Sequence, residues 1–288
     1  MEGGDYSYVE NGNTVECVFG TNPFTVPWQD IASGLAWGLG YFGMPHILVR
    51  FMSIKKSSMM KKSATVAIIW VILSLGAAIV IAILGRVLVA QELLTVGLQK
   101  NVFIKLVQML FPPFVIGILL SAIIAAAMST ADSQLLVASS SFTSDIYKPI
   151  FRKNASDKEV LWVGRLVVLI VAVIAYFIAS SKSSGAQSIM NMVENAWGGF
   201  GSAFGGVIIL SVYWKRLTYK GAVAAVITGA VVDVAWLVWL TGPTGVYELL
   251  PGFFAGLIVA IVVSLIDKKP NEEVLKIYET ATDKSIDD

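Results

Sequence analysis

Seven apolar stretches, each near the length that crosses a bilayer, constrain this 288-residue chain more than any other feature. They are bounded by charges or turn residues and cover residues 31–49, 63–85, 106–138, 162–181, 195–213, 221–240 and 249–266. A helix needs about 20 apolar residues to cross the hydrocarbon core. Hydrophobic residues make up 56% of the chain and charged residues 14%, outside the usual range of soluble domains. With no alternating strand-length segment in view, the sequence predicts an all-α, multi-pass membrane protein.

The basic residues predict how these helices are oriented. Seventeen of the 21 come after the first, third, fifth and seventh stretches, counting Arg165 at the start of the fourth stretch, and the other four lie between the second and third or between the fourth and fifth. Because cytoplasmic loops carry an excess of Lys and Arg, we expect the amino terminus outside and the carboxyl terminus in the cytoplasm. We therefore divide the chain into an extracellular loop-like segment (1–27), a transmembrane region (28–267) and a cytoplasmic tail (268–288). A net charge of +1 gives no support to nucleic acid as a partner.

The first apolar stretch predicts a broken helix. Within eight residues it holds three glycines and a proline, namely Gly38, Gly40, Gly43 and Pro45. The glycines spell G-x-G-x-x-G, but a dinucleotide site needs a preceding strand and a later acidic residue, and neither is present here. Irregular backbone at membrane depth is tolerated where it lines a cavity or is buried in protein. Trp37 and Tyr41, one turn apart, are positioned to wall a small apolar solute; an interfacial aromatic belt or a glycine-lined helix contact remains the alternative.

A second candidate site lies near the end of the third stretch. Residues 106–131 carry no charge, and Ala126, Ser129 and Thr130 fall at i, i+3 and i+4. One backbone carbonyl and two hydroxyls therefore share a helix face. Oxygen-only ligands of this kind suit a hard monovalent cation such as sodium. The alternative is structural, since small hydroxyl residues also pack membrane helices closely or bond back to the preceding turn.

Several long motifs of this chain resemble the sodium:solute symporter family. They are WGLGYFGMPHILVRFM (residues 37–52), MSTADSQLL (128–136), WVGR (162–165) and AWGGFGSAFG (196–205). The resemblance runs from about Pro27 to Trp236. It implies a leucine-transporter-like fold built from two inverted repeats, of which these seven helices would be the carboxyl-terminal part. The acidic segment before the first helix then resembles an extracellular loop, and an amino-terminal half is expected to be missing.

The resemblance also implies a function and its residues. It implies sodium-coupled symport of proline into the cell, with sodium as the co-transported ion. Trp37, Tyr41 and Pro45 match residues that shape the solute site, and Ser129 and Thr130 match hydroxyl ligands of sodium, with Ala126 offering a carbonyl. Symport of another amino acid or a carboxylate, or a seven-helix receptor, are the alternatives. An enzyme is disfavoured, because one histidine and no paired acids supply no nucleophile and base.

Two further acids lie in or near the apolar stretches. Asp233 is the one charge within residues 221–240, and an intramembrane carboxylate is a functional candidate by default. Its helix lies outside the two repeats by resemblance, so we expect a contact with water or a neighbouring helix. Glu194 precedes the fifth stretch, where we expect an exposed acid at a helix start.

Overall fold

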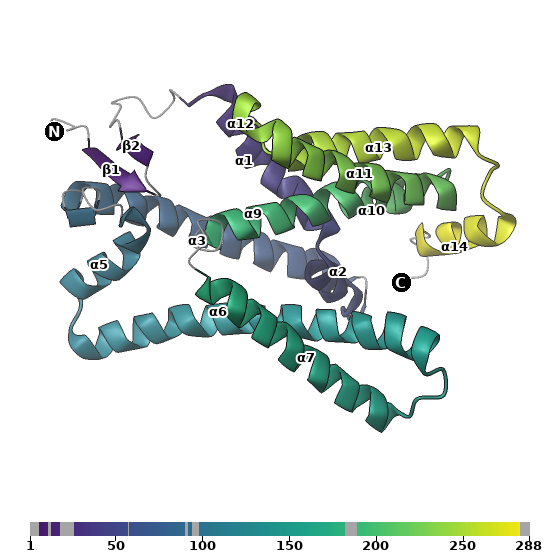
Figure 1. The fold of residues 1–288 in the computed structure, drawn as a ribbon, viewed down its shortest axis with the longest axis horizontal. Coiled ribbons are helices and arrows are strands. Elements are labelled where there is room, and N and C mark those ends of the chain that lie inside the picture. Colours follow the sequence, from purple (N-terminus) through teal and green to yellow (C-terminus); the bar gives the residue numbers. More distant parts are fainter. Residues whose placement is uncertain are drawn as a thin grey trace. The chain divides into compact units, whose positions relative to one another are not determined.

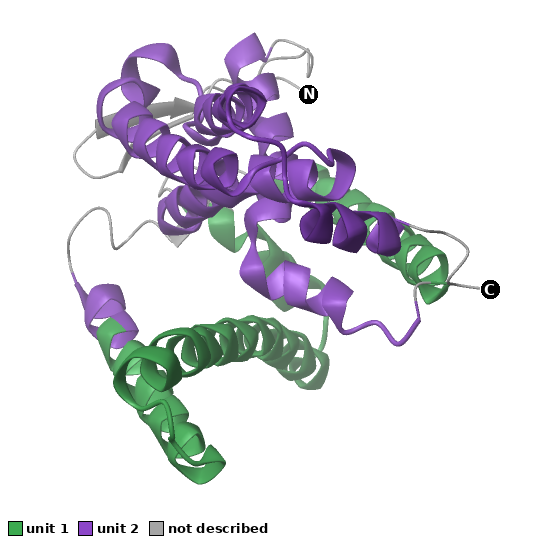
Figure 2. Ribbon diagram, turned by 90° about the vertical axis from the view of Figure 1, so that its right-hand side faces the viewer, with its two compact units in different colours: residues 1–25, 58–174 green, residues 26–57, 175–288 purple. Residues whose placement is uncertain are grey.

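The computed structural model describes residues 6–10, 13–17, 26–56, 58–89, 92–93, 98–181 and 189–282. The chain divides into two compact units, residues 1–25 with 58–174 and residues 26–57 with 175–288 (Figure 2). Within the described residues, six helices are long and apolar enough to cross a membrane. They are Met59–Leu88, Pro113–Phe151, Asp157–Ser180, Met190–Tyr213, Tyr219–Trp239 and Leu249–Ile266. The helical, multi-pass prediction is confirmed.

The first unit begins with a β-hairpin that was not predicted. Strands β1 (Tyr6–Glu10) and β2 (Asn13–Cys17) pair antiparallel, with Tyr6 opposite Cys17. Tyr, Val and Thr favour strands, and the sequence between the two strands is Asn-Gly, the pair most typical of tight hairpins. The prediction that this chain has no strand-length segment was therefore wrong for residues 6–17.

After the hairpin, the first unit is helical, and its longer helices are labelled in Figure 1. They are α3 (Met59–Leu88), the 3₁₀ turn η2 (Gln99–Asn101), α5 (Val102–Leu110), α6 (Pro113–Ser141), the π-helical η3 (Phe142–Phe151) and α7 (Asp157–Ser180), which belongs to this unit up to Ile174. A buried cluster of Val89, Leu93 and Leu106 joins the end of α3 to α5. The Ser139 hydroxyl of α6 donates to the Gly164 carbonyl of α7 at 2.9 Å.

The predicted helix over residues 106–138 is in fact interrupted. Helix α5 ends at Leu110, Pro112 is extended (φ −69°, ψ 156°), and α6 begins at Pro113. The residue before a proline is pushed out of the helical region, whereas proline itself is well accommodated in the first helical turn. The double proline therefore divides this apolar stretch into two helices.

The second unit contains the broken helix and the last three apolar stretches. Its elements are α1 (Trp28–Gly40), the 3₁₀ turn η1 (Tyr41–Gly43), α2 (Pro45–Met52), α9 (Ile189–Phe200), the π-helical η4 (Gly201–Gly205), α10 (Gly206–Tyr213), α11 (Tyr219–Trp239), α12 (Thr241–Thr244), α13 (Leu249–Ile266) and α14 (Glu272–Thr282). Helices α11 and α13 lie side by side (Figure 1).

Small residues bring α11 and α13 together. Each helix buries such residues at intervals of four: Gly221, Ala225 and Gly229 on α11, and Gly252, Gly256, Ala260 and Ser264 on α13. A Cβ on Gly256 would lie 3.1 Å from the Ala225 carbonyl oxygen, so the backbones are close. Close backbone approach through small residues is the usual way in which membrane helices associate, because lipid is as apolar as the side chains. This pair is the framework of the second unit.

Candidate functional site

The first apolar stretch is broken where the sequence predicts. Helix α1 ends at Gly40, the 3₁₀ turn covers Tyr41–Gly43, and α2 begins at Pro45. Met44 between them is extended (φ −84°, ψ 113°), as expected for a residue that precedes a proline. The break exposes the amino terminus of α2, which carries a partial positive charge.

Two glycines of the break permit close contact with α9 and η4. A Cβ on Gly40 would overlap the indole of Trp197. A Cβ on Gly43 would overlap the Phe200 carbonyl and lie 2.9 Å from the Gly201 Cα. In contrast, a Cβ on Gly38 meets no described atom within 4 Å. Gly40 and Gly43 therefore serve helix contact, which was the predicted alternative to a solute site.

Four aromatic rings, Trp37, Tyr41, Trp197 and Tyr247, form a cluster beside the break. The Trp37 ring stacks on Trp197 (centroids 5.9 Å apart) and on Tyr247 (5.8 Å), and Tyr41 meets Trp197 edge-on at 4.8 Å. The Trp197 indole N–H donates to the Trp37 carbonyl at 3.0 Å. Tyr41 is 55% exposed and Trp37 is half-buried, so the cluster presents a partly exposed apolar surface. Pro45, also half-buried, begins α2 next to this surface.

Two members of this aromatic cluster, Trp197 and Tyr247, were not predicted from the sequence. Trp197 stands within the motif of residues 196–205, and its place beside three glycines was an available signal. Tyr247 lies in a short connection between α12 and α13 and gave no such signal. Only the packing of α1 against α9 and α13 brings these rings to Trp37.

Tyr247 is fixed in place by hydrogen bonds at both ends. Its hydroxyl donates to the Glu194 carbonyl at 2.7 Å, and its backbone N–H donates to the Ser33 hydroxyl at 3.1 Å. Burial, followed by the nearby carboxylates of Glu248, Glu194 and Asp233, raises the pKa of the Tyr247 hydroxyl well above its ordinary value. The phenol therefore stays neutral and acts as a donor that holds its ring against Trp37.

Behind the aromatic cluster lies a pair of buried acids. Asp233 on α11 and Glu248 before α13 are each 2% exposed. The Ser202 hydroxyl donates to Asp233 Oδ1 at 2.8 Å, and the Thr241 hydroxyl donates to Glu248 Oε2 at 3.3 Å. The expected contact of Asp233 with a neighbouring helix is confirmed. The expectation of no paired acids was wrong, because the two lie on different elements, and Glu194 is half-buried within α9 rather than exposed at its start.

The hydroxyl face predicted for sodium lies on α6, in the first unit. The Thr130 hydroxyl donates to the Ala126 carbonyl at 3.2 Å, and the Ser133 hydroxyl donates to the Ser129 carbonyl at 3.0 Å. Ala126, Ser129 and Thr130 are exposed on this helix. The Thr130 and Ser133 hydroxyls thus bond back to the preceding turn. Each donates its hydrogen in this bond, so the lone pairs of its oxygen stay available to a cation.

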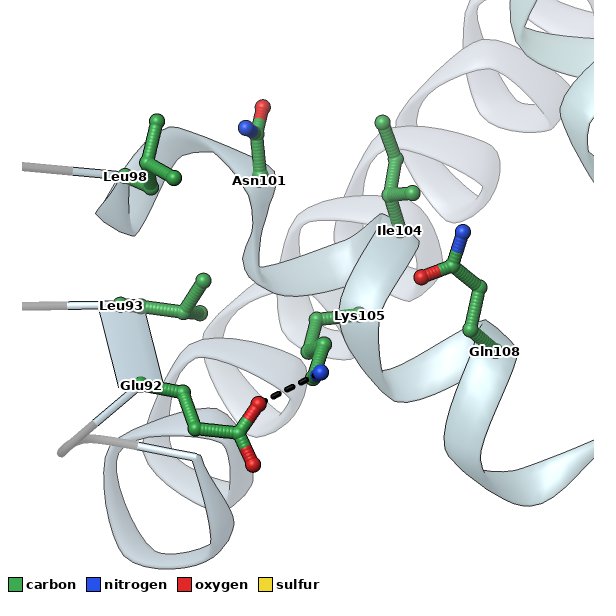
Figure 3. Close-up of a pocket in the computed structure, with 7 residues that line it drawn as sticks. All are labelled: Glu92, Leu93, Leu98, Asn101, Ile104, Lys105 and Gln108. Carbon is green, nitrogen blue, oxygen red and sulfur yellow. Dashed lines mark ion pairs between the residues drawn. The ribbon is translucent and has the colours of Figure 1, made fainter. Parts of the chain in front are cut away.

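A cavity of about 280 Å³ lies elsewhere in the first unit (Figure 3). Its lining is Glu92, Leu93, Leu98, Asn101, Ile104, Lys105 and Gln108. An ion pair joins Lys105 to Glu92 across one side of it. The cavity contains none of the residues predicted for solute or sodium.

Comparison with known proteins shows to which family this chain belongs. The sequence model of the sodium:solute symporter family matches residues 6–229. The chain belongs to this family. It is 43% identical over 253 residues to a sodium/proline symporter of Haemophilus influenzae and 42% over 255 residues to that of Escherichia coli. It is 46% identical over 253 residues to sodium/proline symporter 2 of Staphylococcus saprophyticus.

These alignments cover most of this chain but only part of each relative. They include 85%, 87% and 85% of the chain for the Haemophilus, Escherichia and Staphylococcus proteins. The corresponding shares of the relatives are 50%, 50% and 49%. This member of the sodium:solute symporter family therefore spans about half the length of the curated relatives it matches.

Proposed function

We propose that this protein takes part in sodium-coupled symport of proline into the cell, as a transporter and not an enzyme. The observation that carries the proposal is the break at Gly40–Pro45, flanked by the stacked rings of Trp37, Trp197 and Tyr247. Broken helices of this kind provide substrate sites in secondary transporters, because they expose helix ends within the membrane. The names of three relatives add sodium and proline as the transported pair.

The chemistry of the break suits a small zwitterion with an apolar ring. In this proposal, the proline ring lies against the face formed by Trp37 and Tyr41, where burial of apolar surface supplies binding free energy. The amino terminus of α2 at Pro45 offers a positive dipole end to the solute carboxylate. Met44 is 6% exposed beside this position, so the immediate wall of the break is apolar.

Sodium is assigned in this proposal to the α6 hydroxyl face of Ala126, Ser129 and Thr130. A carbonyl and two hydroxyls give neutral oxygen ligands, which replace part of the hydration shell of a small cation. Coupling then means that sodium raises the affinity for solute, and by linkage solute raises the affinity for sodium by the same factor. The proposed orientation places the amino terminus outside and the tail from residue 268 in the cytoplasm.

Uptake measurements test this proposal. The chain is co-expressed with the amino-terminal half of the Escherichia coli symporter in cells that lack proline uptake, and labelled proline is followed against external sodium. Thr130→Val removes one oxygen ligand of the ion. Because a hydrogen bond or similar contact to a charge contributes about 1.5–3 kcal/mol, the half-saturating sodium concentration should rise at least about tenfold.

Thr65→Val is the matched control, since the Thr65 hydroxyl also bonds back to the preceding turn, at 2.9 Å on α3. It should leave the sodium dependence unchanged. Equal half-saturating sodium in the Thr130→Val variant and the unmodified chain would remove the support for the α6 site. Uptake that does not depend on sodium would refute the proposed coupling itself.

A further inference from the structure

The acid pair of the second unit has an unsatisfied oxygen. Asp233 and Glu248 are each 2% exposed, and Glu248 Oε1 has no hydrogen-bond partner. Among the described residues, no ion pair involves either acid. A buried carboxylate without compensation is costly, and natural proteins pair such charges or bind a cation with them. The pair therefore requires a ligand or a partner that these side chains do not supply.

Both acids face one point beside Gly198. A Cβ on Gly198 would lie 3.1 Å from Asp233 Oδ1 and 3.4 Å from Glu248 Oε1. The two oxygens are therefore no farther apart than the sum of these two distances, and both border the space that the missing Cβ leaves open. The next residue adds to this arrangement, because a Cβ on Gly199 would lie 3.8 Å from Asp233 Oδ2. Glycine at position 198 keeps the space between the carboxylates free.

Further oxygens border the acid pair. Ser202 Oγ lies 2.8 Å from Asp233 Oδ1 and 3.3 Å from the Leu249 carbonyl, and Thr241 Oγ1 lies 3.3 Å from Glu248 Oε2. The other titratable groups that face the pair are Glu194 on α9 and Tyr247, which carry no positive charge at neutral pH. The surroundings thus consist of carboxylate, hydroxyl and carbonyl oxygens, which are the ligands of hard cations.

We propose that Asp233 and Glu248, with the hydroxyls of Ser202 and Thr241, form a site for a small monovalent cation of the sodium type. A monovalent cation between the carboxylates satisfies Glu248 Oε1 and offsets one of the two buried negative charges. The site lies on α11, α12, η4 and the start of α13 and shares no residue with the α6 hydroxyl face.

This cation site is linked to the aromatic cluster through Trp197 and Tyr247. Trp197 directly precedes Gly198, and its indole donates to the Trp37 carbonyl at 3.0 Å. Glu248 is likewise adjacent to Tyr247, whose ring stacks on Trp37. A cation that orders the two carboxylates therefore restrains both rings on which Trp37 rests. Sodium binding here should change tryptophan fluorescence.

The test uses the purified 288-residue chain in lipid nanodiscs at constant pH and ionic strength. Sodium chloride replaces choline chloride stepwise while tryptophan fluorescence and the unfolding temperature are recorded. We expect a saturable sodium response that potassium reproduces only at much higher concentration. Glu248→Gln and Asp233→Asn should each raise the half-saturating sodium at least tenfold, and Gly198→Ala should do the same by filling the space.

The controls separate this site from the α6 face and from loss of folding. Glu279→Gln changes an exposed acid of α14 and should leave the response unchanged. Thr130→Val should also retain it, so a failure of the proposed α6 site leaves this result intact. Circular dichroism without sodium shows whether each variant folds. If a carboxamide variant does not fold, Gly198→Ala still tests the site, because it keeps both acids.

Three outcomes would overturn the cation site. The first is the absence of a sodium response in the unmodified chain. The second is a response that Glu248→Gln, Asp233→Asn and Gly198→Ala all leave unchanged. The third comes from a separate pH titration in choline chloride: a fluorescence change on acidification that Glu248→Gln abolishes, with no response to sodium, would show that the pair binds a proton.

Discussion

Replacing Gly40 with alanine should destabilise the second unit, and the structure gives the expected size. The added Cβ would overlap the Trp197 indole, so the ring must move. Overpacking of this kind costs about 1–3 kcal/mol. Displacement of the ring also breaks the 3.0 Å hydrogen bond to the Trp37 carbonyl, a further loss of about 1 kcal/mol. Alanine returns about 1 kcal/mol through its higher helix propensity.

The net loss is therefore about 1–3 kcal/mol of unfolding free energy for Gly40→Ala. Gly38→Ala is the matched control, because it lies on the same helix two residues earlier and its Cβ meets no described atom within 4 Å. That variant should gain up to about 1 kcal/mol from helix propensity. Unfolding of the purified chain by denaturant in mixed micelles measures both values. If Gly40→Ala proves as stable as Gly38→Ala, the close contact between α1 and α9 is wrong.

Three other predictions address the solute, pH and the extent of the chain. Trp37→Ala should weaken proline binding in the co-expressed complex by about 1–3 kcal/mol, because it removes a ring stacked on two others; unchanged affinity in equilibrium binding would exclude a direct role. The Lys220 ammonium holds the pKa of Asp267 below its ordinary value, so this pair stabilises the fold above about pH 4 and the contribution is lost as the pH falls. Lys220→Met should therefore lower the unfolding temperature at pH 7 and have no effect at low pH, while equal effects at both would contradict the pairing. The 288-residue chain alone in liposomes should show no sodium-driven proline accumulation, because inverted-repeat transporters place their sites between two halves and the chain spans half of its relatives; accumulation above a gradient-free control would refute this.

The apolar periodicity and the prolines determined the outline of the protein. A long apolar stretch without strand-type alternation satisfies its backbone polar groups in lipid by forming a helix, so the membrane class followed from sequence alone. The break at Pro45 was predictable because proline acts on its own neighbours through local sterics. The same rule applies at Pro112 and Pro113, where the predicted continuous helix was wrong although the signal was present. The hairpin of β1 and β2 was likewise missed although a local signal, the Asn-Gly pair between the strands, was present.

The site was only partly accessible from sequence. Trp37 and Tyr41 could be placed together because they lie one helical turn apart, and Ala126 and Thr130 for the same reason. Helical spacing says which residues share a face but not what that face meets. Trp197 and Tyr247, which complete the aromatic cluster around Trp37, come from segments more than 150 residues away in the chain.

The buried acids show most clearly what only tertiary structure decides. In the sequence Asp233 is an isolated charge in an apolar helix, and Glu248 is an acid in a connecting segment. Small residues on α11 and α13 allow those helices to approach, and Gly198 on α9 leaves the space that both carboxylates border. Local propensity determines each helix by itself, whereas the pairing of two distant charges depends on which helix surfaces pack together.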